Sequence, residues 1–214
     1  MKAAWSVALV LLLVVALAGC SGLRSQVPET VSYVLRAPPA GEPVPASAAA
    51  PSGPLSSRAL KVAPVVAQPG YDGDRILLLG EDRSLGYFAA SRWIEPLPAI
   101  VGTLAVEMLR DTAALRSVLD EAAPFVADYR LRLTIRRFDA EYPSPGRSPR
   151  ITVSLAGTVA RADRAILENF VVQAQVEASA DRMTAVVTAF EQAAQRALGE
   201  AVQRTLGVLQ TASD

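Results

Sequence analysis

The sequence predicts an α/β (α+β) fold: a two-layer arrangement of a mixed, largely antiparallel sheet with helices packed mainly on one face. Two observations carry this prediction. Three segments, near residues 129–136, 151–159 and 170–177, alternate apolar and polar residues, as antiparallel strands with one buried face do. Two further segments, beginning near residues 97 and 183, have the apolar spacing of amphipathic helices, and both need a sheet face to cover.

The chain begins with a segment that is typical of an exported protein. Met1 and Lys2 precede an apolar run over residues 3–16, which is shorter than the ~20 residues that span a bilayer. We therefore interpret residues 1–19 as a signal peptide. Residues 20–30 show no periodicity and are expected to form a tether.

The run Leu17-Ala18-Gly19-Cys20 resembles the bacterial lipobox, in which the cysteine sulfur receives a diacylglycerol. We predict lipidation at Cys20, because two or more acyl chains give stable anchoring in a membrane. The alternatives are a generic signal peptide with an accidental cysteine and a plain membrane anchor. Ser21, where Asp would retain the protein in the inner membrane under enterobacterial sorting, implies the outer membrane and its periplasmic face.

Residues 31–214 are expected to form a single domain that contains one insert. Residues 31–35 have the composition of a strand. Residues 37–57 hold six prolines among alanine, serine and glycine, so we predict a disordered insert that acts as a spacer. A peptidoglycan-binding or partner-binding segment is the alternative interpretation.

The next elements are a strand, a loop, a hairpin and a helix. Residues 60–67 are expected to form a strand that Pro64 places at an edge or a bulge. A turn-rich loop, 68–74, precedes a hairpin formed by residues 76–79 and 85–90. A helix then begins at Pro96 or Pro98. Its apolar stripe is Leu97, Ile100, Val101, Leu104, Ala105 and Met108.

A three-stranded meander follows an ambiguous stretch, 111–125, which we read as a helix tail and a short edge strand. Apolar residues of the first two strands define a dry face: Tyr129, Leu131, Leu133, Ile135, Ile151, Val153, Leu155 and Val159. Their alternating neighbours define a wet face: Arg130, Arg132, Thr134, Arg136, Thr152, Ser154 and Thr158. The alternation indicates a sheet with one solvated side.

The last element is a long helix whose apolar stripe runs from Met183 to Val202. Asp181 is the expected N-cap, and Glu200 and Arg204 have the spacing of an i,i+4 ion pair. Its polar face mixes acids and arginines. This favours packing on the core over lying on a membrane surface, which a basic face would indicate.

Composition excludes several classes of function. The chain has no histidine and one cysteine, which excludes catalysis by an intrachain imidazole and multi-cysteine metal sites. The formal net charge of zero argues against a nucleic-acid partner. We read Asp72 and Asp74 as an ordinary turn, because the twelfth position of an EF-hand loop starting at Asp72 is Arg83. We expect no enzyme activity, cofactor or metal.

The remaining candidate site is a row of arginines on the first meander strand. Arg130, Arg132 and Arg136 are expected on its wet face, where they would dock an acidic protein surface or phospholipid phosphates. A solvated face balanced by acids explains the same pattern. Trp93 is read as a core anchor, with a ligand platform as the alternative.

In order and spacing, several segments resemble the ABC-type transport auxiliary lipoproteins of the paraquat-inducible lipoprotein kind. Besides Cys20, they are Tyr33-Val34-Leu35, the run from Pro69 to Ile76, Leu85-Gly86-Tyr87 leading to Ser91-Arg92-Trp93, and Ala127 to Leu131 ending in Arg137-Phe138. The long insert at 37–57 and the leucine-rich strand at 76–79 depart from the family pattern.

The resemblance implies a non-enzymatic outer-membrane lipoprotein. It would serve an ABC permease, its ATPase and an MCE-domain periplasmic protein, and the system would move lipids or other hydrophobic molecules between the two membranes. The protein would reach the outer-membrane lipid through Cys20. A structural or assembly lipoprotein that supports envelope integrity without contacting lipid is the alternative. The sequence leaves the oligomeric state open.

Overall fold

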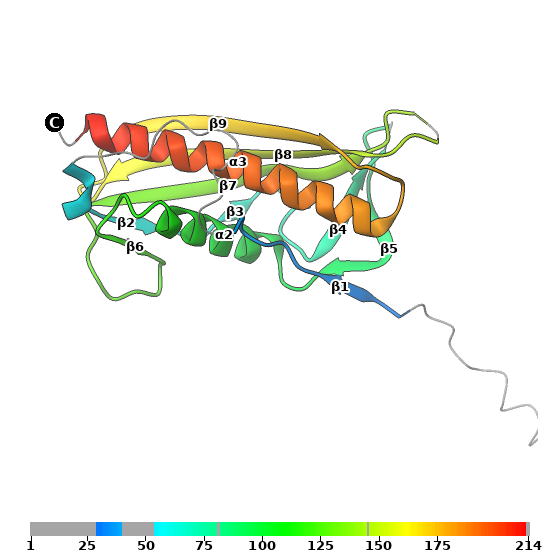
Figure 1. Ribbon diagram of the computed structural model, residues 1–214, viewed down its shortest axis with the longest axis horizontal. Helices are drawn as coiled ribbons and strands as arrows, with labels where there is room; N and C mark the ends of the chain where they lie inside the picture. The colour runs from blue at the N-terminus through cyan, green and yellow to red at the C-terminus, as the bar shows by residue number, and fades with distance from the viewer. Residues whose placement is uncertain (1–28, 40–53, 81, 145, 213–214) are drawn as a thin grey trace, which may run out of the picture. The chain divides into compact units, whose positions relative to one another are not determined.

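A computed structural model describes residues 29–39, 54–80, 82–144 and 146–212. The chain divides into two units, 1–30 and 31–214, and every element named below belongs to the second. Within the described residues, a nine-stranded sheet with two α-helices confirms the predicted α+β class (Figure 1). The elements are β1 (Val31–Tyr33), β2 (Ala59–Val62), β3 (Val66–Ala67), β4 (Arg75–Leu79), β5 (Leu85–Trp93), α2 (Leu97–Asp111), β6 (Ser117–Leu119), β7 (Tyr129–Glu141), β8 (Arg150–Arg161), β9 (Ile166–Glu177) and α3 (Met183–Thr211).

Strand β7 joins the two parts of the sheet. One edge of β7 pairs with β8 in antiparallel register along its whole length, and β8 pairs in turn with β9. The other edge is shared by three short parallel partners: β2 near Tyr129, β3 near Thr134 and β4 near Asp139. The sheet is therefore mixed but largely antiparallel, as predicted.

The short strands extend the sheet beyond β7 in two directions. Strand β2 pairs with the edge strand β6, while β4 and β5 form the expected hairpin and β5 pairs with β1. Pro64 is exposed and lies between β2 and β3, so the segment expected as one strand is two. A proline cannot donate to the ladder, which accounts for the break.

The meander has the predicted dry face. Leu131, Leu133 and Ile135 of β7 are buried, and so are their apolar counterparts on β8. Phe170 of β9 lies opposite Gly157, and a Cβ at position 157 would meet its ring at 2.2 Å. Glycine at 157 therefore makes room for the aromatic ring, which belongs to the core.

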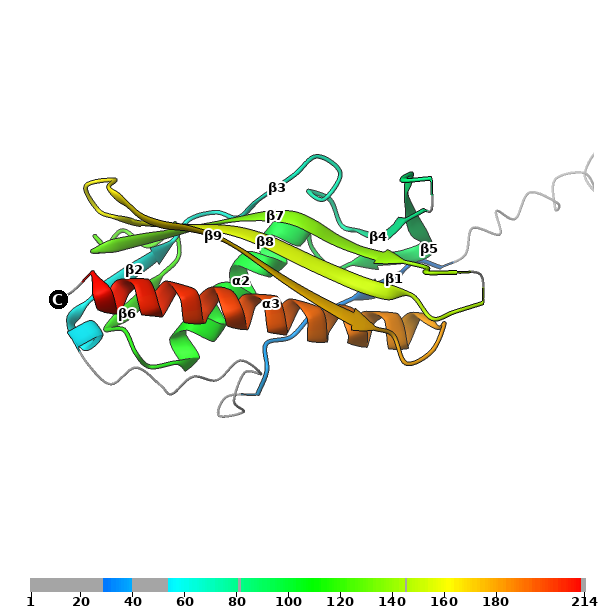
Figure 2. The same cartoon turned by 90° about the horizontal axis from the view of Figure 1, so that it is seen from above.

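Both helices cover this dry face (Figures 1 and 2). Helix α2 packs on β2 and β6, and α3 packs on β8 and β9. All six residues of the predicted α2 stripe are buried. The expected N-cap Asp181 does not cap α3, whose N-terminus has no side-chain cap. The Oδ1 atom of Asp181 instead accepts a hydrogen bond from the Tyr142 hydroxyl at 2.6 Å.

Three buried aromatic rings connect β5, β7 and α3. The Trp93 ring meets Phe138 and Phe190 edge-on, with centroids 6.1 and 5.4 Å away, and the two phenylalanine rings stack at 5.3 Å. Such pairs add about 0.5–1.5 kcal/mol each beyond the area they bury. Trp93 is thus a core anchor in this structure.

The C-terminal end of the expected insert is structured. Residues 40–53 lie outside the described residues, but Pro54–Ser57 form a 3₁₀ helix. Its Leu55 is 2% exposed and belongs to the core, and Ala37 at the other end packs against the same core. Among the described residues, the expectation of disorder fails at these two ends because they carry apolar side chains that the core accepts.

Replacing Leu55 by Ala tests whether this end of the insert is part of the core. We predict that Leu55→Ala lowers the free energy of unfolding by about 2–5 kcal/mol, because it leaves a cavity. Ile94→Ala is the control, since Ile94 is 59% exposed. Urea unfolding followed by circular dichroism measures both variants; equal stabilities would show that Leu55 does not contribute to the core.

Candidate functional site

The three candidate arginines of β7 do not form one group. Arg130 pairs with Glu121 of the loop after β6, and the neighbouring Lys61 of β2 donates from Nζ to the Ala123 carbonyl at 3.0 Å. These two contacts hold the loop against the start of β7. The charge of Arg130 is therefore already compensated within the chain.

Arg132 and Arg136 are exposed, and the described residues offer neither of them an ion pair. The pairing of β7 with β8 shifts between Ile135 and Arg137, so Arg136 lies in a β-bulge and has no partner residue on β8. The alternation predicted for Arg130, Arg132 and Arg136 holds, since all three are exposed, and it breaks only from Arg137 on. A bulge re-aims the side chains that follow it.

Beyond the bulge, the outer face of β7 carries a polar cluster that the sequence analysis missed. Asp139 is fully buried; its Oδ2 accepts the Tyr71 hydroxyl at 2.7 Å, and its Oδ1 accepts Nη2 of Arg137 at 2.6 Å. Arg137 also lies 3.5 Å from Glu141. The sequence signal was an acid and an arginine two residues apart after the expected strand, but only the structure adds Tyr71.

The cluster changes the proton affinity of its members. Partial burial, and then the hydrogen bond to Asp139, raise the pKa of Tyr71 to about 12. The hydrogen bond to Asp139 also raises the pKa of Arg137. A buried carboxylate with two donors of this kind satisfies its charge internally. The geometry stabilises the loop that carries Tyr71 and leaves Asp139 inaccessible to a substrate.

This cluster explains why part of the predicted wet face is dry. Thr152 lies between Asp139 and Gln175 in the register of the sheet, accepts a hydrogen bond from Gln175 at 3.3 Å and is 1% exposed. Ser154, opposite Arg137, is buried as well. Both were expected to be solvated; instead the neighbouring long side chains remove them from water. Thr158 is half-buried and bonds to Asn169.

The loop at 68–74 fastens several elements through its backbone. Gly70 has a φ of +93°, which disfavours any residue with a Cβ. The carbonyl of Gly73 accepts the amide of Leu97 at the start of α2, and the carbonyl of Asp74 accepts the amide of Trp93. Asp74 also lies 3.8 Å from Arg92. The described residues contain no group of acids that could hold a metal ion.

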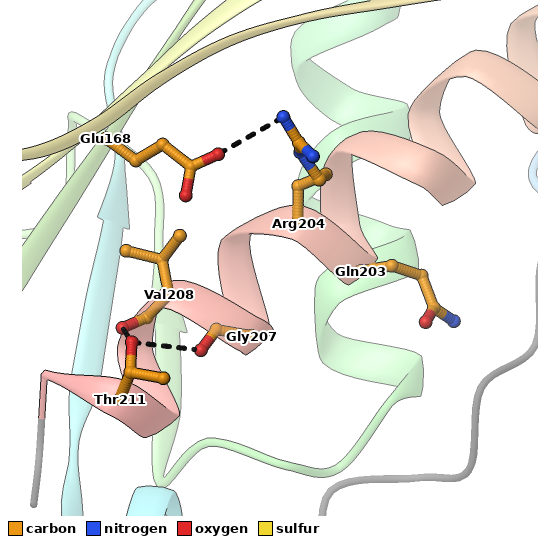
Figure 3. A pocket seen from close by; sticks show the side chains of 6 residues that line it. All are labelled: Glu168, Gln203, Arg204, Gly207, Val208 and Thr211. Carbon is orange, nitrogen blue, oxygen red and sulfur yellow. Dashed lines mark hydrogen bonds and ion pairs between the residues drawn. The ribbon is translucent and has the colours of Figure 1, made fainter.

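A shallow groove of about 390 Å³ lies between β9 and the C-terminal part of α3 (Figure 3). Its lining includes an ion pair between Arg204 and Glu168 at 3.3 Å. The expected pair of Glu200 with Arg204 is therefore replaced by a contact with β9, which also places the guanidinium 6.0 Å from the centre of the Phe170 ring. The full lining is Glu168, Gln203, Arg204, Gly207, Val208 and Thr211.

Cys20 and Ser21 lie outside the described residues, so lipidation and membrane destination remain predictions. In the part of the chain that the structure describes, no helix is both long and apolar enough to cross a membrane.

Replacing Tyr71 by Phe tests the polar cluster. The folded pKa of Tyr71, about 12, lies above its ordinary value of 10.0, so its contribution to stability is complete below pH 10 and is lost as the pH rises through 12. We predict that Tyr71→Phe removes one phenol titrating near pH 12 and lowers the free energy of unfolding at pH 7 by about 1–3 kcal/mol.

Tyr142→Phe is the matched control. The pKa of Tyr142 is also raised to about 12, by desolvation and then by Asp181, but Asp181 is exposed. This variant loses a high-pH phenol with a smaller change in stability at pH 7. Ultraviolet titration and urea unfolding measure both quantities; a wild-type stability for Tyr71→Phe would contradict the role of the cluster.

Comparison with solved structures supports the fold. Protein XCC0632 from Xanthomonas campestris is 25% identical, with a TM-score of 0.68, over 76% of this chain and 92% of that one. An uncharacterised protein is 13% identical, with a TM-score of 0.62, over 83% and 99% of the two chains. No curated protein matches the sequence.

The comparison with protein families covers more of the chain. The model of the ABC-type transport auxiliary lipoprotein component matches residues 33–202, which run from the end of β1 into α3. This range contains the 68–74 loop, the aromatic cluster and β7. The chain therefore belongs to the family of ABC-type transport auxiliary lipoprotein components.

Proposed function

We propose that this protein is a lipid-anchored auxiliary component of an ABC transport system at the periplasmic face of the outer membrane. Cys20 carries the acyl chains, and the folded unit works with an ABC permease, its ATPase and an MCE-domain periplasmic protein. The system moves lipids or other hydrophobic molecules between the two membranes. The family match over residues 33–202 is the observation that carries the proposal.

The roles of the conspicuous polar residues support a binding function rather than a catalytic one. Asp139, Arg137 and Tyr71 satisfy one another and fasten a loop. Asp74 and Gly73 accept backbone hydrogen bonds that fix β5 and α2. Because these groups are committed to the fold, the protein would contribute surfaces and an anchor, while other members of the system supply ATP hydrolysis.

The open face of the sheet supplies a docking surface in this proposal. Arg132 and Arg136 are exposed there, whereas Arg130 is engaged by Glu121. Exposed guanidinium groups can form charge-assisted hydrogen bonds with carboxylates of a partner protein. Complementary charges also speed the association of the two proteins. We assign the partner contact to Arg132 and Arg136, with Arg130 acting through the loop after β6.

A structural or assembly lipoprotein is the second candidate. Two paired edges of β7 and a buried aromatic cluster make a rigid scaffold, which such a role also needs. In that case the protein would bind envelope proteins but no component of a transporter.

Cys20→Ala tests the anchor. We predict an unprocessed precursor without acyl chains, because no thiol remains to receive the diacylglycerol. Mass spectrometry of the mature N-terminus provides the readout, with Ser21→Asp as a second variant that moves the protein toward the inner membrane of an enterobacterial host. A wild-type N-terminus that is cleaved elsewhere and carries no lipid would refute the anchor.

Arg132→Gln combined with Arg136→Gln tests the docking surface. We predict an intact fold, since surface substitutions change stability by less than about 0.5 kcal/mol each. Affinity for the purified MCE-domain protein should fall about tenfold or more at low salt, and wild-type binding should weaken as salt rises. Arg130→Gln is the matched control and should retain more affinity. Equal affinity of wild type and double variant would remove both arginines from the interface.

A further inference from the structure

Strand β9 is an unusual edge for this sheet. The other strands with a single partner, β1, β3 and β6, are two or three residues long, whereas β9 has twelve. From Asn169 to Glu177 the register with β8 is unbroken, and the strand contains neither proline nor lysine. Short edges, prolines, charged residues and bulges are the usual means by which natural sheets prevent further pairing. Strand β9 is long and holds no proline, and its register shift and its two glutamates lie near its ends.

The outer edge of β9 is open to a further strand. The structure pairs β9 with β8 alone, and no backbone hydrogen bond among the described residues joins β9 to any other segment. In an antiparallel ladder about half of the amide and carbonyl groups of such a strand point away from its partner. An extended backbone is the ligand that satisfies a row of alternating donors and acceptors.

The groove described above lies at the start of β9, between Glu168 and the C-terminal part of α3 (Figure 3). Arg204 and Glu168 neutralise one another within it, so the groove carries no net charge from its own side chains. Val208 is half-buried and Gly207 is exposed, which gives the floor a small apolar area. An uncharged side chain of modest size fits this chemistry.

Gly207 lines the groove and adds no side chain to it. It lies inside a 29-residue helix, where glycine is a poor helix former. A Cβ at this position would meet nothing within 4 Å, so packing does not demand glycine. Its absence of a side chain instead leaves the space beside β9 free.

We propose that β9 and this groove bind an extended segment of a partner protein as an additional strand of the sheet. The backbone of that segment pairs with the free edge of β9, and one uncharged, apolar side chain enters the groove beside Gly207. Strand addition of this kind takes affinity from main-chain hydrogen bonds and specificity from a pocket between the edge strand and a helix. The site is separate from the arginines of β7 and stands without the proposed transport role.

The test uses the full-length lipoprotein in detergent and a phage-displayed library of random ten-residue peptides as the probe. We expect selection of peptides that share one apolar residue among uncharged, strand-forming neighbours. A synthetic copy of the strongest binder should slow hydrogen exchange of amides within residues 166–177. Methylation of alternate backbone nitrogens of the peptide should abolish binding while leaving its side chains unchanged, which tests strand pairing independently of any protein variant.

Gly207→Leu should weaken binding of that peptide about tenfold or more, because it fills the groove. Thr184→Leu, which adds the same side chain to an exposed position in the first turn of α3, should bind as the wild type does. Circular dichroism verifies that both variants are folded. The proposal is overturned if no peptide is selected, if the selected peptide binds Gly207→Leu equally, or if exchange slows outside β9. The proposal is also overturned if the protein without peptide has twice the monomer mass and its β9 amides are already protected from exchange, because a second copy would then occupy the edge.

Discussion

The structure depends on one strand whose backbone groups are paired on both edges. Strand β7 gives one edge to β8 and divides the other among β2, β3 and β4, segments that come from distant parts of the chain. Its side chains then serve two layers, since Phe138 joins the buried aromatic cluster while Asp139 faces the other side of the sheet. Buried backbone groups require partners, so the loops before and after these short strands must bring them to β7.

Most of the conspicuous polar residues hold the loops that bring the short strands to β7. The 68–74 loop connects β3 to β4, and it is fixed by Tyr71 on Asp139, by the Gly70 turn and by two carbonyls that reach β5 and α2. The family resemblance rests partly on these residues and their order in the sequence. In the structure they stabilise the sheet, so partner binding would use the exposed surfaces that they do not occupy.

Much of the fold follows from local patterns. Alternation in β7, β8 and β9 and the stripes of α2 and α3 depend on near neighbours, so the sequence predicts them directly. The parallel pairings of β2, β3 and β4 are non-local and leave no period in the sequence. The bulge at Arg136, the burial of Asp139 and Thr152, and the docking of Leu55 were missed for the same reason: each depends on a segment far along the chain. The exposure of the three arginines follows from the alternation, whereas the register shift after Ile135 does not.

We propose that this chain acts as the lipid-anchored auxiliary subunit of an ABC transport system. Purification of the tagged protein, expressed at its native level and extracted from its own membranes with mild detergent, tests this most directly. Quantitative mass spectrometry should find the permease, the ATPase and the MCE-domain protein together and in fixed ratio to the bait. Their joint absence from a purification that retains the intact, acylated lipoprotein would contradict the account.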